Sequence, residues 1–241
     1  MTTQSPPYRH SGEPHASGLS QRLNWLRAGV LGANDGIVST AAVVVGVAGA
    51  TAEVTPVFLA GAAALVGGAI SMALGEYVSV SSQRDTERAL IEKERRELEE
   101  DPEVELEELV GLYEEQGLTP GTARLVATEL TERDALKAHL ALELNIDQED
   151  VVSPWHAAFA SLIAFTIGAV LPLLTILLLP HPARIVWTFV AVLLALAVTG
   201  YVAAWIGGSH RWRAVARLVI GGALALGATF LVGSLFGTVV G

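Results

Sequence analysis

Five long stretches without charged side chains constrain the fold of this sequence more than any other feature. Each stretch lacks Asp, Glu, Lys and Arg, and together they cover residues 36–52, 54–75, 151–183, 185–210 and 218–241. A helix needs about 20 mostly apolar residues to cross the hydrocarbon core of a membrane. All five stretches meet this requirement if the first extends back through Asp35 toward Trp25. The composition agrees, since 51% of the residues are hydrophobic and only 17% are charged, and we therefore exclude a soluble enzyme.

The basic residues predict the orientation of these helices, because Lys and Arg are enriched in cytoplasmic connections. The predicted transmembrane helices lie at about 25–50, 55–82, 155–179, 184–207 and 215–239. Outside residues 84–152 the arginines are Arg9, Arg22 and Arg27 before the first helix, Arg184 between the third and fourth, and Arg211, Arg213 and Arg217 between the fourth and fifth. The N-terminus is therefore predicted in the cytoplasm and the C-terminus outside. No apolar run precedes Trp25, so we predict no cleaved signal peptide.

The acidic residues are concentrated in the connection between the second and third predicted helices. Residues 84–152 hold 21 of the 25 acidic and 8 of the 15 basic residues. This segment should attract cations and repel polyanions, so we expect no nucleic-acid partner. Cysteine is absent from the sequence, which excludes a disulfide framework, an iron–sulfur cluster or a thiolate site.

Capping signals divide this acidic segment into helices. The second transmembrane helix has no breaking signal before Glu100, so we expect it to continue beyond the membrane as one long helix. Asp101-Pro102 begins a second helix that ends near Gly117, and Thr119-Pro120 begins a third that ends near Asn145. We expect the third helix to bury a face made of Leu125, Leu130, Leu136, Leu140 and Leu144.

These signals together predict an all-α, polytopic membrane protein with five transmembrane helices and a cytoplasmic three-helix domain. The predicted parts are a disordered cytoplasmic tail at 1–22, transmembrane helices 1 and 2 at 23–83, the acidic helical domain at 84–152, and transmembrane helices 3–5 at 153–241.

Three residues in the first two transmembrane helices could carry chemistry. Asp35 is ionisable inside a span, where such groups usually face a pathway or a partner. Met72 is predicted at a similar depth, and Glu76 lies one turn away on the same helix face. Two carboxylates and a thioether suit a borderline-soft divalent metal better than magnesium or calcium. The alternative is that Met72 fills a packing gap and Asp35 is a hydrogen-bonded structural residue.

A second set of candidate ligands lies in the acidic domain. Its members are spaced three or four residues apart, as helix faces require, and comprise Glu94, Glu97, Glu105, Glu108, His139 and Glu143. Paired carboxylates from several helices, sometimes with a histidine, hold iron or manganese in helical bundles. The alternative is a solvated, salt-bridged surface, which the run EKERRELEE at 92–100 resembles. No P-loop, HExxH or nucleophile motif supports an ATP-driven pump or a hydrolase.

Two sequence blocks resemble the vacuolar iron transporter family. They are ANDGIVST at 33–40 and GGAISMALGEYVSVSSQRD at 67–85, and the acidic insert and five spans are similar as well. The resemblance covers about residues 22–240. It implies a homodimer of five-helix protomers whose ion path lies at the two-fold interface, with a cytoplasmic metal-binding domain after the second span. The implied activity is export of Fe²⁺, and often Mn²⁺, from the cytoplasm in exchange for protons, and no permanently bound cofactor is expected.

The resemblance also assigns roles to individual residues. The transmembrane aspartate and methionine of the family fall on Asp35 and Met72, and Glu76 lies in the matching block. The glutamates of the metal-binding domain fall on Glu94, Glu97, Glu105, Glu108 and Glu143. Plant members carry methionines just before the last of these, where this sequence has His139 and Leu140. His139 is therefore a possible nitrogen ligand, and the domain's metal preference stays open.

The sequence as a whole predicts a dimeric divalent-metal exporter rather than an enzyme. Carboxylates that bind either a metal or a proton could couple the two fluxes without ATP. The alternatives are a membrane-anchored ferritin-like ferroxidase, which usually has Glu-x-x-His motifs on a four-helix bundle, and a metal sensor. We expect a bacterial plasma membrane, or a vacuolar membrane if the source is a eukaryote.

Overall fold

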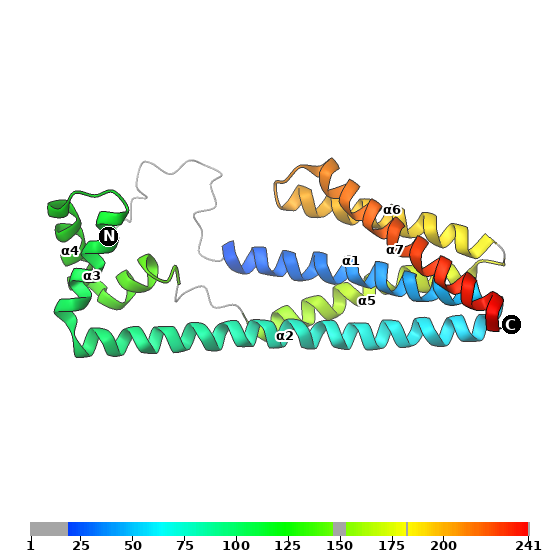
Figure 1. Cartoon of the computed structure of the whole chain (residues 1–241), viewed down its shortest axis with the longest axis horizontal. Coiled ribbons are helices and arrows are strands. Elements are labelled where there is room, and N and C mark those ends of the chain that lie inside the picture. Colours follow the sequence, from blue (N-terminus) through cyan, green and yellow to red (C-terminus); the bar gives the residue numbers. More distant parts are fainter. Residues whose placement is uncertain (1–18, 147–152, 182, 241) are drawn as a thin grey trace, which may run out of the picture. The chain divides into compact units, whose positions relative to one another are not determined.

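The structure is a computed structural model that describes residues 19–146, 153–181 and 183–240 (Figure 1). All regular elements in these ranges are helices, and they are α1 (Leu19–Ala50), α2 (Val54–Glu100), α3 (Pro102–Glu115), α4 (Pro120–Leu142), α5 (Pro154–Leu178), α6 (Ala183–Ile206) and α7 (Arg211–Val240). Most of the predicted disordered tail lies outside the described residues. Its end does not, because α1 begins at Leu19, inside the predicted tail.

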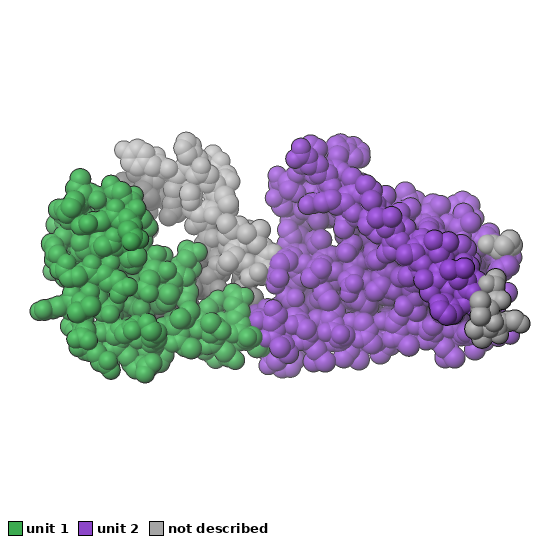
Figure 2. Space-filling view, in the orientation of Figure 1, with its two compact units in different colours: residues 1–21, 81–152 green, residues 22–80, 153–241 purple. Residues whose placement is uncertain are grey.

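The chain forms two compact units, which are coloured separately in Figure 2. The membrane unit consists of Arg22–Val80 and Ser153–Gly241, and the acidic unit includes Ser81–Val152. Helix α2 contributes to both units, because it continues without interruption for 47 residues. The prediction of one long helix is therefore correct.

Five helices of the described chain are long and apolar enough to cross a membrane, which confirms the predicted all-α polytopic fold. These helices are α1, α2, α5, α6 and α7. Large apolar side chains project outward from them, including Leu178, Trp187 and Leu231. Exposed apolar area on this scale is expected for a surface that faces lipid rather than water.

Helix α1 is packed against α5 and α7 through glycines that leave no room for a side chain. A Cβ on Gly36 of α1 would overlap the backbone of Phe165 in α5, and one on Gly168 would overlap the carbonyl oxygen of Ala33. In the same way Gly233 of α7 lies against the backbone of Gly46. Small residues permit such close approach between helices in lipid, where no water drives helices together.

Other glycines of α1 and α2 have no neighbour of this kind. Gly29, Gly67 and Gly75 have open space where a Cβ would be, whereas Gly68 faces the ring of Phe165. The GxxxG pair at Gly233 and Gly237 contacts α1 of the same chain. Glycine spacing alone could not distinguish glycines that contact another helix of the chain from glycines with open space beside them.

The acidic unit contains a hairpin of α3 and α4. Gly117 between them has a positive φ of 98°, which glycine adopts without strain and which suits the end of a helix. The N-cap residues Asp101 and Thr119 are where the sequence predicts them, although neither side chain makes a capping hydrogen bond.

The predicted leucine face of α4 is partly wrong. Leu125 is 60% exposed, while Ala123 and Ala127 are fully buried against Leu109 of α3. Alanine permits the two helices to approach closely. The helix is also interrupted at Asp134, whose φ of −170° and ψ of 89° are not helical, so one leucine stripe cannot continue through it.

Candidate functional site

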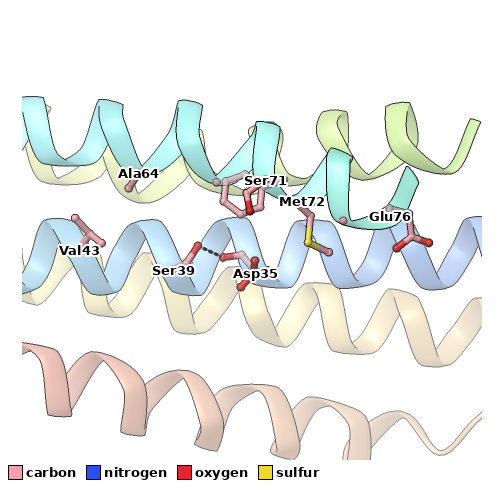
Figure 3. Close-up of a pocket in the computed structure, with 10 residues that line it drawn as sticks. Asp35, Ser39, Val43, Ala64, Ser71, Met72 and Glu76 are labelled. Atoms are coloured by element: carbon pink, nitrogen blue, oxygen red, sulfur yellow. Dashed lines mark hydrogen bonds between the residues drawn. The ribbon is translucent and has the colours of Figure 1, made fainter. Parts of the chain in front are cut away.

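The membrane unit contains a cavity of about 350 Å³ between α1, α2 and α5 (Figure 3). Its lining consists of small, apolar and a few polar residues, namely Asp35, Ser39, Val43, Ala64, Gly68, Ser71, Met72, Gly75, Glu76 and Phe165. The structure therefore brings Asp35, Met72 and Glu76, the three predicted pathway residues, to one cavity.

Helical periodicity explains how the cavity forms. Asp35, Ser39 and Val43 are four residues apart and so share one face of α1. Met72 and Glu76 are related by the same spacing on α2. Gly68, one turn before Met72, leaves room for the ring of Phe165, which closes the cavity on the α5 side.

The polar groups in this cavity are few. Ser39 donates a hydrogen bond through Oγ to the backbone carbonyl of Asp35, so the carboxylate of Asp35 is not its acceptor. Figure 3 shows Asp35 and Met72 on the two facing helices, with Glu76 one turn farther along α2. A carboxylate and a thioether that face each other can bind a divalent ion that accepts both oxygen and sulfur.

A second group of potential ligands is buried in the acidic unit. Glu94 of α2, Glu105 of α3 and His139 of α4 each offer a ligand atom, and these atoms all lie within 4.8 Å of one another. The three residues are 3%, 7% and 0% exposed. Charged side chains are almost never buried to this extent unless they are paired or bind a metal.

The imidazole of His139 lies at the centre of this group. Its Nδ1 lies 3.0 Å from Oε1 of Glu94, and 3.8 Å from Oε2 of both Glu105 and Glu143. The side chain of Glu143 is more open, at 27% exposed. Neither imidazole nitrogen, nor Oε1 of Glu94, makes a hydrogen bond with the described residues. Buried polar atoms without partners that face one another have the arrangement of ligands around a cation.

The pKa shifts in this group also favour a cation-binding site. Burial, followed by the nearby charges of Glu143 and Glu105, raises the pKa of Glu94 to about 7. Burial also raises the pKa of Glu105, and it lowers the pKa of His139 although carboxylates surround it. A divalent cation would offset the mutual repulsion of the carboxylates and so lower their pKa values again. It would also bind the neutral imidazole that the lowered pKa of His139 already favours.

Two predicted ligands lie outside this buried group. Glu97 is 39% exposed in its side chain and forms a 2.7 Å ion pair with Lys93, one turn before it. Glu108 is exposed. Both nevertheless contribute to the raised pKa of Glu94 through their charge. The six candidates thus divide into a buried trio, the partly open Glu143, and two peripheral carboxylates.

The sequence did not indicate one polar contact of the membrane cavity. Arg27 of α1 lies 3.1 Å, Nη2 to Oε1, from Glu76. The sequence assigned Arg27 only to membrane orientation. The sequence did contain a signal for a role in the cavity, because Arg27 is an ionisable residue inside a predicted membrane span, which is unusual.

The fold and the donor groups first define a class of protein. Five helices of the described chain are long and apolar enough to cross a membrane, and three of them line a cavity with carboxylate and thioether groups. The acidic unit gathers buried carboxylates around a histidine. These are the features of an integral, multi-pass membrane protein equipped to bind cations. Within this class the chain belongs to the VIT family, whose model matches residues 26–234.

Relatives from an amoeba and from plants support this assignment. A protein named vacuolar iron transporter from Acanthamoeba castellanii is 45% identical over 225 residues, which is 93% of this chain and 83% of the relative. Vacuolar iron transporter homolog 2 of Arabidopsis thaliana is 36% identical over 90% of this chain and 87% of its own. Vacuolar iron transporter homolog 5 of Oryza sativa is 37% identical over 88% of this chain and 80% of its own length. The resemblance inferred from the two sequence blocks is therefore confirmed.

Proposed function

We propose that this protein exports Fe²⁺ and Mn²⁺ from the cytoplasm across its membrane in exchange for protons. The observation that carries the proposal is the cavity lined by Asp35, Met72 and Glu76, because it places metal-binding groups inside the membrane-crossing helices. The names of the relatives support iron as a substrate.

In this proposal the buried trio of the acidic unit collects the metal. The basic residues at the helix ends support a cytoplasmic N-terminus, and α2 then begins outside and carries the acidic unit into the cytoplasm. Glu94, Glu105 and His139 would bind the ion there, with Glu143 completing the site from its more open position. Metal binding displaces protons from such a site, which provides the chemistry for exchange.

We further propose that two copies of the chain assemble around the ion path. The cavity is open on one side of α1 and α2, and Gly67 and Gly75 on α2 have nothing against them. Only 17% of the most apolar window of α2 is buried, compared with 39% for α1. A second copy would cover this face and would shield Asp35 from lipid. Native mass measurement in detergent should give two chains, and an active monomer would contradict the assembly.

The alternative of a ferritin-like ferroxidase has less support. Such sites usually take two Glu-x-x-His motifs from facing helices. Here one histidine serves the whole buried trio, and its helix partner Glu143 follows it by four residues.

Uptake into sealed vesicles tests the proposed function directly. Purified protein in liposomes should accumulate Fe²⁺ and Mn²⁺, and a pH gradient across the membrane should accelerate this uptake. Zn²⁺ and Ca²⁺ serve as comparison ions. A sensor or a ferroxidase would bind metal without moving it, so the absence of uptake in vesicles that still bind Fe²⁺ would reject transport.

A further inference from the structure

The ion pair between Arg27 and Glu76 joins two residues with very different surroundings. The Glu76 side chain is 8% exposed, whereas that of Arg27 is 58% exposed. Glu76 lines the membrane cavity, and Arg27 reaches it from α1, two turns before Asp35. The carboxylate is therefore the more confined partner, and the guanidinium has more freedom to leave the pair.

The positive charge of Arg27 allows it to compete with a metal ion for the carboxylate of Glu76. Its guanidinium already lies on one of the carboxylates that the proposed function assigns to the metal. An ion pair with one exposed partner is weak, because the exposed side chain is solvated and loses conformational freedom when it pairs. Its separation thus costs little compared with the attraction of a divalent ion to the same carboxylate, which is twice that of a monovalent ion at equal distance.

We propose that Arg27 is a tethered cation that occupies Glu76 when no metal is bound and that an arriving divalent ion displaces. This inference rests on the proposed function and makes Arg27 a specificity-determining residue for it. Arg27 is held to the same protein, so its effective concentration at Glu76 is high, in the millimolar range for short tethers. A monovalent ion is attracted to Glu76 no more strongly than the arginine that it would replace. A divalent ion is attracted more strongly, so the arginine disfavours Na⁺ and K⁺ relative to divalent ions at this end of the cavity.

The alternative role is a structural clamp between α1 and α2. The two roles predict opposite effects of Arg27→Gln on metal uptake, because a lost competitor strengthens binding whereas a lost clamp loosens the cavity. Arg27→Lys is the matched control, since it keeps the charge.

Initial rates of Mn²⁺ uptake in liposomes separate these roles. Arg27→Gln should lower the half-saturating Mn²⁺ concentration about three- to fivefold, the range that a pair of this strength permits. In this variant, replacing a bulky organic cation in the buffer with K⁺ should also slow Mn²⁺ uptake. Both effects should be absent in Arg27→Lys and should vanish when Glu76→Gln is added. An unchanged or higher half-saturating concentration in Arg27→Gln would overturn the proposal.

A labelling experiment tests the same proposal without relying on transport. The chain has no cysteine, so Ser71→Cys places a single thiol on the cavity lining. A methanethiosulfonate reagent converts that thiolate to a mixed disulfide and releases a sulfinate. With Arg27 present, a cationic reagent should react more slowly than a neutral one. The ratio of the cationic to the neutral rate should rise several-fold in Arg27→Gln and stay low in Arg27→Lys.

Thr55→Cys provides the control site, because Thr55 is exposed near the start of α2, far along the helix from Glu76, and does not line the cavity. Its ratio should not respond to Arg27. An equal response at both positions, or none at Ser71→Cys, would reject the tethered cation. If the wild type moves no metal but this labelling pattern appears, the transport proposal fails while the tethered cation stands.

Discussion

The two groups of candidate ligands differ in ways that suit different tasks. The membrane group lines an open cavity of about 350 Å³ with small and apolar walls. The acidic group is buried, and its three ligand atoms lie within 4.8 Å of one another. A site on a conduction path must bind an ion firmly enough to admit it and weakly enough to release it. Sparse ligands in an open cavity therefore suit passage of an ion, whereas convergent buried ligands suit its capture.

The strongest test of this division is Asp35→Asn. We expect this variant to abolish uptake at every metal concentration, because the neutral amide loses the charge that offsets dehydration of the ion inside the membrane. Initial uptake into liposomes measures the effect. Glu53→Gln is the matched control, since Glu53 is an exposed carboxylate in the connection after α1 and should be dispensable. Full activity in Asp35→Asn would remove the proposed pathway.

Neutralising the buried acidic ligands should have a large but different effect. With Glu94→Gln and Glu105→Gln together, we expect metal binding to the full chain to weaken by more than about a hundredfold, because the loss of an outer-shell partner alone costs about ten- to a hundredfold. Uptake should slow at low metal and recover at saturating metal. Calorimetric titration with Mn²⁺ measures the binding. Glu97→Gln with Glu108→Gln is the peripheral comparison, and equal losses in both pairs would contradict the division into buried and peripheral ligands.

The pH dependence of binding sharpens the same comparison. Because the pKa of Glu94 is raised to about 7, Glu94 holds a proton at pH 6 that an incoming metal must displace, and it is largely ionised at pH 8. Mn²⁺ affinity should therefore fall about tenfold between pH 8 and pH 6, as expected for one displaced proton. Glu94→Gln should flatten this dependence. If Glu94→Gln leaves the pH dependence of Mn²⁺ affinity unchanged, the displaced proton belongs to another group.

The smallest expected effect concerns Met72. Met72→Leu conserves volume and apolarity, so the fold should lose less than about 1.5 kcal/mol. We expect Fe²⁺ uptake to decline more than Mn²⁺ uptake, because the harder ion depends less on a thioether. Parallel measurement of both ions in the same vesicles provides the internal control. Wild-type rates for both would make Met72 a packing residue.

Much of the fold could be predicted from the sequence because its signals are local. Charge-free stretches located the membrane helices, and the Pro102 and Pro120 start signals located α3 and α4. The interruption at Asp134 was not predicted, since the residues around it favour a helix. In the structure the Asp134 carboxylate accepts a hydrogen bond from the backbone N–H of Lys137, which caps the second half of α4. A cap inside a helix-forming run competes with the helix itself, and tertiary packing decides between them.

Candidate ligands could be selected from the sequence, but their geometry could not be predicted. Spacing of three or four residues showed that each glutamate pair shares a helix face. It could not show that Glu94 and His139, 45 positions apart, would meet at 3.0 Å, because that depends on how three helices pack. The same limit explains why Glu97 and Glu108 were grouped with the buried ligands.

The glycine contacts of α1 have a mechanical consequence for the cavity. At Gly36, Gly168 and Gly233 the facing atoms belong to the backbone, which cannot rotate aside as a side chain can. Sliding or turning α1 against α5 or α7 would bring bulkier residues into gaps that accept only hydrogen. Helix α1 is thus the stationary wall of the cavity. The glycines of α2 face only side chains or open space, so we expect any change in the width of this cavity to come from α2.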